Sequence, residues 1–218
     1  MGLRRVELAN APIIAPGSAS GGRRRGTSLS LPADLWSDPD ENRAFFREMG
    51  VPDERIHPVK ANAAEGLPFE PEFFDAVVSI DSYNYFGRDP QYLGERLLPY
   101  VKSGGRIYLS IPGMVRDCHD ALPTCLLASW DAEQLEYMHD MAWWRAMIGQ
   151  TSGVVIEDMH QMACTSEAWA DWIACDNEYA QGDRAAVEAH ATAVAERFGV
   201  VHQVYNNAGV AGGGAVLD

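Results

Sequence analysis

Two apolar stretches constrain the fold of this chain more than any other feature of its sequence. Residues 74–80 (Phe-Asp-Ala-Val-Val-Ser-Ile) form a near-continuous apolar run, which is typical of a strand covered on both faces, and residues 106–111 read as a second buried strand. A helical stretch over 90–100 separates them, and a Lys-Ser-Gly-Gly turn at 102–105 precedes the second strand. Strands that alternate with helices predict an α/β fold, here a three-layer sandwich around a mostly parallel sheet.

Shorter patterns on either side extend this alternation. Asp38 or Asp40 can cap a helix that runs through Met49, and we expect Phe45, Phe46 and Met49 to face inward. The other expected elements are a strand at 56–59, helices at 131–149, 166–180 and 183–198, and strands at 154–156 and 200–205.

Length and composition predict the domain organisation. A chain of 218 residues can bury one substantial core. We expect one domain over 32–205, in which 183–205 supply the last helix and strand and 114–150 form a helical cap. Residues 1–31 read as an irregular leader rich in Arg, Gly and Ala, and 206–218 as a glycine-rich tail.

Charge and cysteine content narrow the class of function. A formal net charge of -14 repels a phosphate backbone, which argues against a nucleic-acid partner. No apolar run approaches the roughly 20 residues that span a bilayer, which argues against a membrane protein. The four cysteines form no Cys-x-x-Cys pair and no signal peptide is recognisable, so we expect a cytoplasmic protein that acts on a small molecule. The oligomeric state stays open.

The first candidate site residues are Asp34, Leu35 and Trp36. Parallel sheets bind ligands outside the carboxyl ends of their strands, where a carboxylate can accept the hydroxyl hydrogens of a ribose. Asp34 has the right chemistry for that role, and the apolar side chains of Leu35 and Trp36 can flank an adenine. The alternative is that Asp34 only caps the helix that follows.

Two further segments follow predicted strands. Residues 62–69 read Asn-Ala-Ala-Glu-Gly-Leu-Pro-Phe, and the strand at 74–80 is followed by Asp81, Tyr83 and Tyr85. An acid and two tyrosines at the carboxyl end of a buried strand suit a ligand site. For Tyr85 and Phe86 the alternative is packing beneath the adjacent helix.

Together these segments resemble the middle of the class I S-adenosylmethionine-dependent methyltransferases. Enzymes of that family carry, in this order and at similar spacing, an "LPF", an "FDAVVS", an acid, an aromatic pair and a "KPGG" turn. The corresponding segments here are Leu67-Pro68-Phe69, residues 74–79, Asp81, Tyr85-Phe86 and residues 102–105, and Trp143-Trp144 resembles part of the late helix. The resemblance covers residues 32 to about 180 and implies a Rossmann-like fold.

The resemblance also implies a cofactor and a reaction. The cofactor would be S-adenosylmethionine, and the reaction would be methyl transfer to a small-molecule acceptor. Asp34 would hold the ribose hydroxyls, and Leu35 and Trp36 would flank the adenine. The full set of implied cofactor contacts is Asp34, Leu35, Trp36, Asn62, Ala63, Ala64, Asp81 and Tyr83.

Catalysis of methyl transfer depends mainly on holding the acceptor in line with the methyl group. Tyr83 and Tyr85 would face the acceptor, and Asp81 or His139 could act as the base that takes its proton. For His139, the alternative is an ordinary satisfied or solvated side chain.

The sequence departs from the family pattern at two places. Ala63 stands where the family keeps an acid that binds the adenine amino group, and Asn62 or Glu65 would have to replace it. The family also opens with a "DxGxGxG" loop whose amides receive the methionine portion, and only 17–22 (Gly-Ser-Ala-Ser-Gly-Gly) is a candidate here. A fold incomplete at its N-terminus and an impaired activity would follow.

A second resemblance lies near the end of the chain. Residues 195–199 and Asn206-Asn207-Ala208-Gly209 are similar to short-chain dehydrogenases, which implies a nicotinamide-dependent oxidoreductase as an alternative function. Neither Lys60 nor Lys102 stands four residues after a tyrosine, so the Tyr-x-x-x-Lys pair of that family is absent. The sequence is also compatible with a non-catalytic Rossmann-like binding protein and with a rearranged reading frame.

A metal site is not expected from the sequence. Cys118-His119-Asp120 offers metal-ligand residue types, but adjacent side chains seldom converge on one ion and no partner spacing supports zinc.

Overall fold

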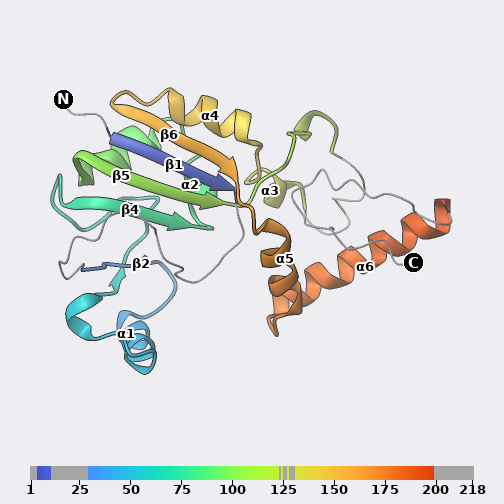
Figure 1. Cartoon of the computed structure of the whole chain (residues 1–218), viewed down its shortest axis with the longest axis horizontal. Coiled ribbons are helices and arrows are strands. Elements are labelled where there is room, and N and C mark those ends of the chain that lie inside the picture. The colour runs from blue at the N-terminus through green and yellow to red at the C-terminus, as the bar shows by residue number, and fades with distance from the viewer. Residues whose placement is uncertain (1–3, 11–28, 123, 125–126, 128–130, 199–218) are drawn as a thin grey trace.

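A four-stranded parallel sheet forms the centre of the molecule (Figure 1). The computed structural model describes residues 4–10, 29–122, 124, 127 and 131–198. In spatial order the strands are β4 (Phe74–Ile80), β5 (Val101–Ile111), β1 (Arg4–Asn10) and β6 (Val154–Gln161), and all three neighbouring pairs are parallel. The predicted α/β fold with a parallel sheet is confirmed.

The first described residues of the chain supply a central strand. β1 lies between β5 and β6, with Asn10 beside Ile111 on one side and Arg4 beside Val154 on the other. The prediction that residues 1–31 form an irregular leader is therefore wrong for this segment. Its alternating apolar positions are too few to identify a strand locally, and the ladders with two distant strands stabilise it.

Helices cover one face of this sheet. α2 (Tyr83–Phe86), the π-helical turn η2 (Tyr92–Leu97) and α4 (Met141–Gly149) pack against alternate residues of β5, and Figure 1 shows α4 along the outer strand β6. The buried members of this core are Tyr83, Tyr92, Leu93, Leu97, Leu98, Val101, Ile107, Leu109, Ile111, Trp144 and Ile148.

The opposite face of the sheet keeps apolar side chains in contact with solvent. Val78 of β4 is 64% exposed, and Ile80 and Val155 are also exposed. The prediction that residues 74–80 are covered on both faces is wrong for Val78 and Ile80. In the part of the chain that the structure describes, the layer on this second face is incomplete.

The predicted turn at 102–105 lies inside a strand. β5 already begins at Val101, and its register with β4 shifts between Phe74 and Ala76. Gly104 has a positive φ of 79°, a conformation that glycine adopts without steric cost. The Gly-Gly pair therefore forms an irregularity in β5. The helical stretch expected over 90–100 is confirmed, and it consists of the π-helix η2 followed directly by the 3-10 helix η3 (Leu98–Tyr100).

Two short strands form a separate sheet. β2 (Ala33–Asp34) pairs in parallel with β3 (Val59–Lys60), and Ser30 forms an isolated bridge with Ile56. The strand predicted at 56–59 is thus shorter and shifted towards Lys60, because the turn η1 (Asp53–Arg55) reaches as far as Arg55.

The helix predicted from Asp38 to Met49 is confirmed as α1 (Pro39–Glu48). The Asp38 carboxylate caps it by accepting a hydrogen bond from the Asp40 backbone N–H at 2.8 Å. The predicted inward direction is wrong for Phe45 and Met49. Both side chains are exposed, and α1 as a whole has no fully buried residue.

The cap and the late helices follow β5. The helix predicted at 131–149 is broken into α3 (Ala132–Leu135) and α4, and residues 136–140 between them form no helix. Beyond β6, α5 (Thr165–Ala174) and α6 (Glu178–Phe198) project away from the sheet (Figure 1). The expected strand at 200–205 and tail at 206–218 lie outside the described residues.

A search of the described helices finds none that is long and apolar enough to cross a membrane.

We predict that Gly105→Ala destabilises the protein by about 1–3 kcal/mol, the usual cost of overpacking. A Cβ at this position would lie 2.8 Å from the Val101 Cγ1 atom and 2.9 Å from the Asp75 carbonyl oxygen. Urea unfolding followed by circular dichroism measures the change. The control is Gly149→Ala at the end of α4, where a Cβ meets nothing within 4 Å. Equal stability of the two variants would contradict the packing described for β5.

Candidate functional site

The ends of β2 and β3 bring two predicted segments together. The Asp34 carbonyl accepts a hydrogen bond from the Ala61 N–H at 2.9 Å, so residues 34–36 and 62–64 leave the same edge of this small sheet. The Asp34 Oδ1 atom also accepts from the backbone N–H groups of Trp36 (2.6 Å) and Ser37 (2.8 Å).

The Asp34 carboxylate is held ionised in this position. The hydrogen bond from the Ser37 backbone is the largest cause that lowers its pKa, and the bond from Trp36 and the charge of Lys60 act in the same direction. The alternative that Asp34 caps the following helix is wrong, because Asp38 caps α1. Trp36 is 86% exposed and Leu35 is also exposed, so both can reach a ligand beside the carboxylate.

The loop that follows β3 is fixed from η2. The Tyr92 hydroxyl donates to the Ala63 carbonyl at 2.8 Å, and an Arg96 guanidinium N–H donates to the Ala64 carbonyl at 2.9 Å. Asn62 and Glu65 are hydrogen-bonded to each other at 2.9 Å. The two groups expected to replace the missing acid at Ala63 therefore partner one another.

Asp81 lies at the carboxyl end of β4, beside the end of β5. Its backbone is in the left-handed region (φ 50°), and its N–H donates to the Ser110 carbonyl at 2.7 Å. Burial raises the pKa of the Asp81 carboxyl to about 6. A carboxylate with a pKa close to neutrality is suited to accept a proton from a substrate.

The two predicted tyrosines have different environments. Tyr83 is 1% exposed and packs against Phe86, Tyr92 and Trp144 in the core. The expectation that Tyr83 faces a ligand is therefore wrong in this arrangement. Tyr85 is partly exposed, and the partial loss of solvent around it, the charge of Asp81 and the neighbouring Tyr137 together raise its pKa.

Tyr85 connects the end of β4 to the cap. Its ring centroid lies 4.9 Å from that of Tyr137, and the Arg88 guanidinium lies 4.6 Å above the Tyr137 ring. Tyr85 and Tyr137 therefore offer aromatic surface, and the charge of Asp81 acts on the Tyr85 hydroxyl.

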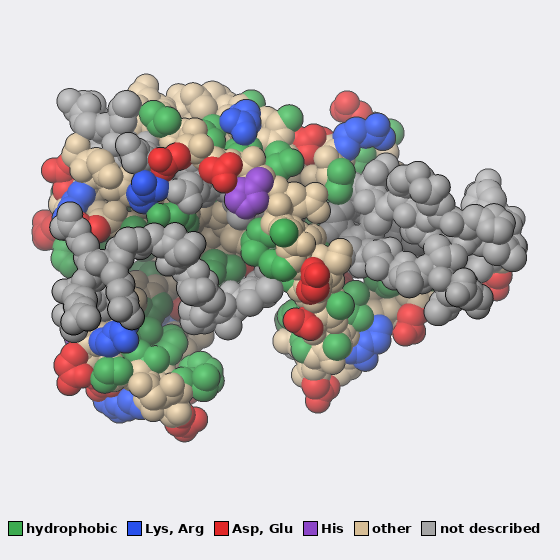
Figure 2. Space-filling view, in the orientation of Figure 1, with side chains coloured by type: hydrophobic (Ala, Val, Ile, Leu, Met, Phe, Trp, Pro, Cys, Tyr) green, Lys and Arg blue, Asp and Glu red, His purple; other side chains and the backbone are tan. Residues whose placement is uncertain are grey.

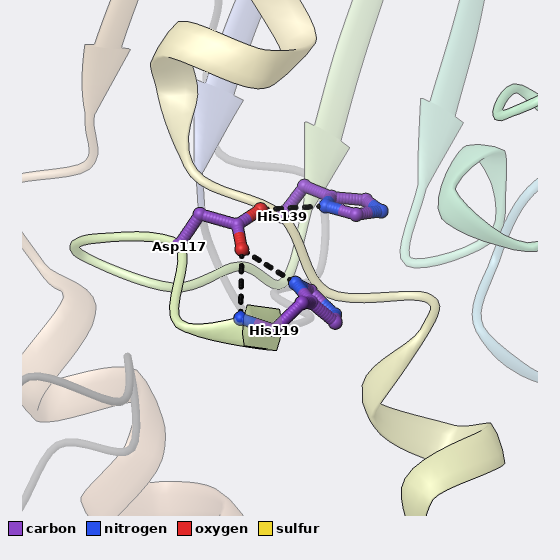
Figure 3. A group of neighbouring side chains, drawn as sticks. All are labelled: Asp117, His119 and His139. Atoms are coloured by element: carbon purple, nitrogen blue, oxygen red, sulfur yellow. Dashed lines mark hydrogen bonds and ion pairs between the residues drawn. The ribbon is translucent and has the colours of Figure 1, made fainter. Parts of the chain in front are cut away.

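His139 belongs to a cluster that was not predicted from the sequence (Figure 3). Its Nδ1 atom lies 2.8 Å from the Asp117 Oδ2 atom, and the His119 Nδ1 atom lies 2.6 Å from Asp117 Oδ1. The signal in the sequence is the Asp-x-His spacing of 117 and 119. Cys118 and Asp120, which flank His119 in the sequence, are not members of this cluster.

Burial and hydrogen bonding set the charges of this cluster. Burial opposes ionisation of Asp117, but the bonds from His139 and His119 prevail and lower its pKa to about 2. Burial also opposes protonation of His119, yet the bonds to Asp117 and the Leu135 carbonyl raise its pKa. For His139, burial prevails and lowers the pKa.

The predicted site residues therefore fall into separate groups. Residues 34–36 meet 62–64 beyond β2 and β3, whereas Asp81 and Tyr85 lie beyond β4, and His139 lies in the cap. Among the described residues, no hydrogen bond or ion pair joins Asp34 to Asp81. On the coloured part of the face in Figure 2, acidic and basic side chains are interspersed.

Comparison with known families finds no match, and comparison with the curated proteins finds none either. Among solved structures, the fold is similar to that of BH2331 from Bacillus halodurans C-125, a protein assigned as a methyltransferase. The TM-score is 0.51 at 16% identity, with 95% of this chain and 86% of that chain covered. The chain thus has a methyltransferase-like, Rossmann-like fold.

A second solved structure is the YcgJ protein of Bacillus subtilis, with a TM-score of 0.43 at 14% identity. The match covers 68% of this chain, which spans 60% of the length of that neighbour. The similarity to BH2331 gives no support to the resemblance of residues 195–209 to short-chain dehydrogenases, and residues 199–209 lie outside the described part of the chain.

We predict that Asp81→Asn stabilises the protein above pH 6 by on the order of 3 kcal/mol, the free energy that corresponds to the rise of the Asp81 pKa to about 6. The folded pKa of about 6 exceeds the ordinary value, so the native state keeps a proton that the unfolded state has released. Stability of the unchanged protein should therefore fall as the pH rises from about 4 to 6 and level off above it. Asparagine tolerates the left-handed backbone and cannot ionise.

Urea unfolding at roughly pH 4 to 8 measures this difference, because that range covers both the fall in stability and the plateau. The control is Asp171→Asn on the exposed side of α5, which should show the pH dependence of the unchanged protein. If the Asp81→Asn variant also followed that curve, Asp81 would not be the buried acid described here.

Proposed function

We propose that the chain transfers a methyl group from S-adenosylmethionine to a small-molecule acceptor. The observation that carries the proposal is the edge of the β2–β3 sheet, where the ionised Asp34 lies beside exposed apolar side chains and the fixed loop 62–64. A methyltransferase-like fold supports the same conclusion at the level of architecture.

The residues present fit the adenosine part of that cofactor. The Asp34 Oδ2 atom takes part in neither of the bonds to the backbone, and it is suited to accept the ribose hydroxyls. Leu35 and Trp36 offer apolar surface to an adenine. Ala63 brings only a methyl group to the loop that leaves the same edge of the sheet, and Tyr92 and Arg96 keep that loop in place.

The acceptor side of the proposal rests on Asp81 and Tyr85. When bound, S-adenosylmethionine supplies a methyl group on a sulfonium, which an acceptor held in line can attack. Asp81 is the residue that we assign to take the proton of the acceptor, because its pKa is near neutrality. His139 is less suited, since its Nδ1 is bonded to Asp117 and its ring is stacked on Trp143.

Charge and cysteine content supply the other features of the proposal. A net charge of -14 disfavours nucleic acid as the acceptor, so we expect a small molecule. The four cysteines form no Cys-x-x-Cys pair, which is the basis for expecting a cytoplasmic location.

We predict that S-adenosylhomocysteine binds the purified protein and that Asp34→Asn weakens this binding about tenfold or more. The substitution keeps an oxygen for the Trp36 and Ser37 N–H groups but removes the charge that strengthens hydrogen bonds to a ribose. Isothermal titration calorimetry measures both affinities, with NADH as a parallel ligand.

Asp38→Asn is the matched control for this experiment. Asp38 also accepts a backbone N–H at 2.8 Å, and asparagine caps a helix as well as aspartate does, so binding should not change. Binding of NADH alone would favour a nicotinamide-dependent oxidoreductase. Binding of neither ligand would favour a non-catalytic Rossmann-like protein and reject the proposal.

A further inference from the structure

We propose that Asp117, His119 and His139 form a binding site for a divalent transition-metal ion, and that zinc is the ion it suits best. This site goes beyond the proposed methyl transfer and does not depend on it. The three side chains come from the loop after β5 and from the segment before α4, and they point towards one another (Figure 3). Their ligand atoms all lie within 4.8 Å of one another.

Two imidazoles and one carboxylate are a donor set of zinc sites that have three protein ligands and an open fourth position. The Asp117 carboxylate lies 2.6 Å from the His119 Nδ1 and 2.8 Å from the His139 Nδ1. Ligand atoms about 2.0–2.2 Å from a tetrahedral zinc are roughly 3.3–3.6 Å apart, so the groups need to separate by about 0.5–1 Å. Small side-chain rotations can supply that change.

The hydrogen bond made by the His119 Nε2 atom favours a role for the Nδ1 atom of the same ring as a metal ligand. Its Nε2 atom lies 3.0 Å from the Leu135 carbonyl oxygen. A carbonyl only accepts hydrogen bonds, so Nε2 carries a hydrogen and the Nδ1 atom is directed at Asp117. Metal-binding histidines usually donate their other N–H to a carboxylate or a carbonyl in this way. A metal ion would replace the proton that His119 Nδ1 otherwise shares with Asp117, and that proton would pass to solvent. The hydrogen that the His139 Nδ1 donates to Asp117 would also leave that atom, and the ring would stay neutral with its hydrogen on Nε2.

The surrounding residues hold the ligands in place. The Asp140 carboxylate accepts from the Asp117 N–H at 3.1 Å and from the Trp143 N–H at 2.8 Å, which ties the two segments together. The His139 ring stacks on the Trp143 ring at 3.7 Å, with 7° between the planes. Little conformational entropy therefore remains to be lost when an ion binds.

The cluster also keeps an opening to solvent. The side chains of Asp117, His119 and His139 are between 10% and 28% exposed, whereas a purely structural zinc site is usually closed by a fourth protein ligand. An ion held here would therefore keep a position for water or for a small oxygen ligand.

We predict that the metal-free protein binds one zinc ion per chain, as measured by equilibrium dialysis and elemental analysis. His119→Asn and His139→Asn should each weaken binding by at least about tenfold, since loss of a supporting partner alone costs that much. The matched control is His160→Asn. His160 lies 2.9 Å from Asp158 in an exposed pair that is not part of the described cluster, so binding should not change.

Cobalt provides a second measurement that does not depend on any variant. Cobalt bound to the unchanged protein should show the intense visible absorption of a four- or five-coordinate ion, and zinc should displace it. The proposal is overturned if the unchanged protein binds no zinc, if cobalt keeps the weak spectrum of its hydrated ion, or if His160→Asn loses as much affinity as the two cluster variants. Neither experiment uses S-adenosylhomocysteine, so the result of the metal-binding tests does not depend on the result of the methyltransferase test.

Discussion

The parallel pairing of β5 with both of its neighbours is the constraint on which the rest of the structure depends. β5 joins β4 to β1, and its alternate residues Ile107, Leu109 and Ile111 face the helices of the core. Parallel strands cannot be joined by tight turns, so each connection must cross over the sheet. Asp81, the Asp117 loop and the other chemically active segments of the central sheet therefore leave it at the same carboxyl edge.

The elements that local sequence determines were predicted correctly. The apolar run at 74–80 and the Asp38 cap of α1 depend on neighbours within a few residues, and both appear where they were expected. β1 was missed because its hydrogen-bond partners lie about a hundred residues or more along the chain. The Gly-Gly segment was misassigned because a turn and a strand irregularity use glycine for the same reason, a positive φ.

The site residues also divide into those whose positions local sequence determines and those whose positions depend on distant contacts. The position of Asp81 follows from the end of the strand at 74–80, which the apolar run indicates well, whereas no strand was predicted at Asp34. The direction of Tyr83 was wrong because a single helical turn gives too few residues to define an inward face. The pairing of Asp117 with His139 could not be predicted, because it depends on the break between α3 and α4 that brings the segment before Met141 back to the loop after β5.

The position of β1 has a consequence for how the protein folds. β1 precedes both of its neighbours in the sequence by a long distance, since they come from residues 101–111 and 154–161. β6 has no partner in the described sheet other than β1, so it cannot join this sheet until β1 has been inserted. Pairing between strands that lie far apart in the sequence slows folding. The long segment between them must close, with a loss of conformational entropy, before the stabilising contacts between the strands can form. Completion of the sheet should therefore be a late event, after β4 and β5 have paired.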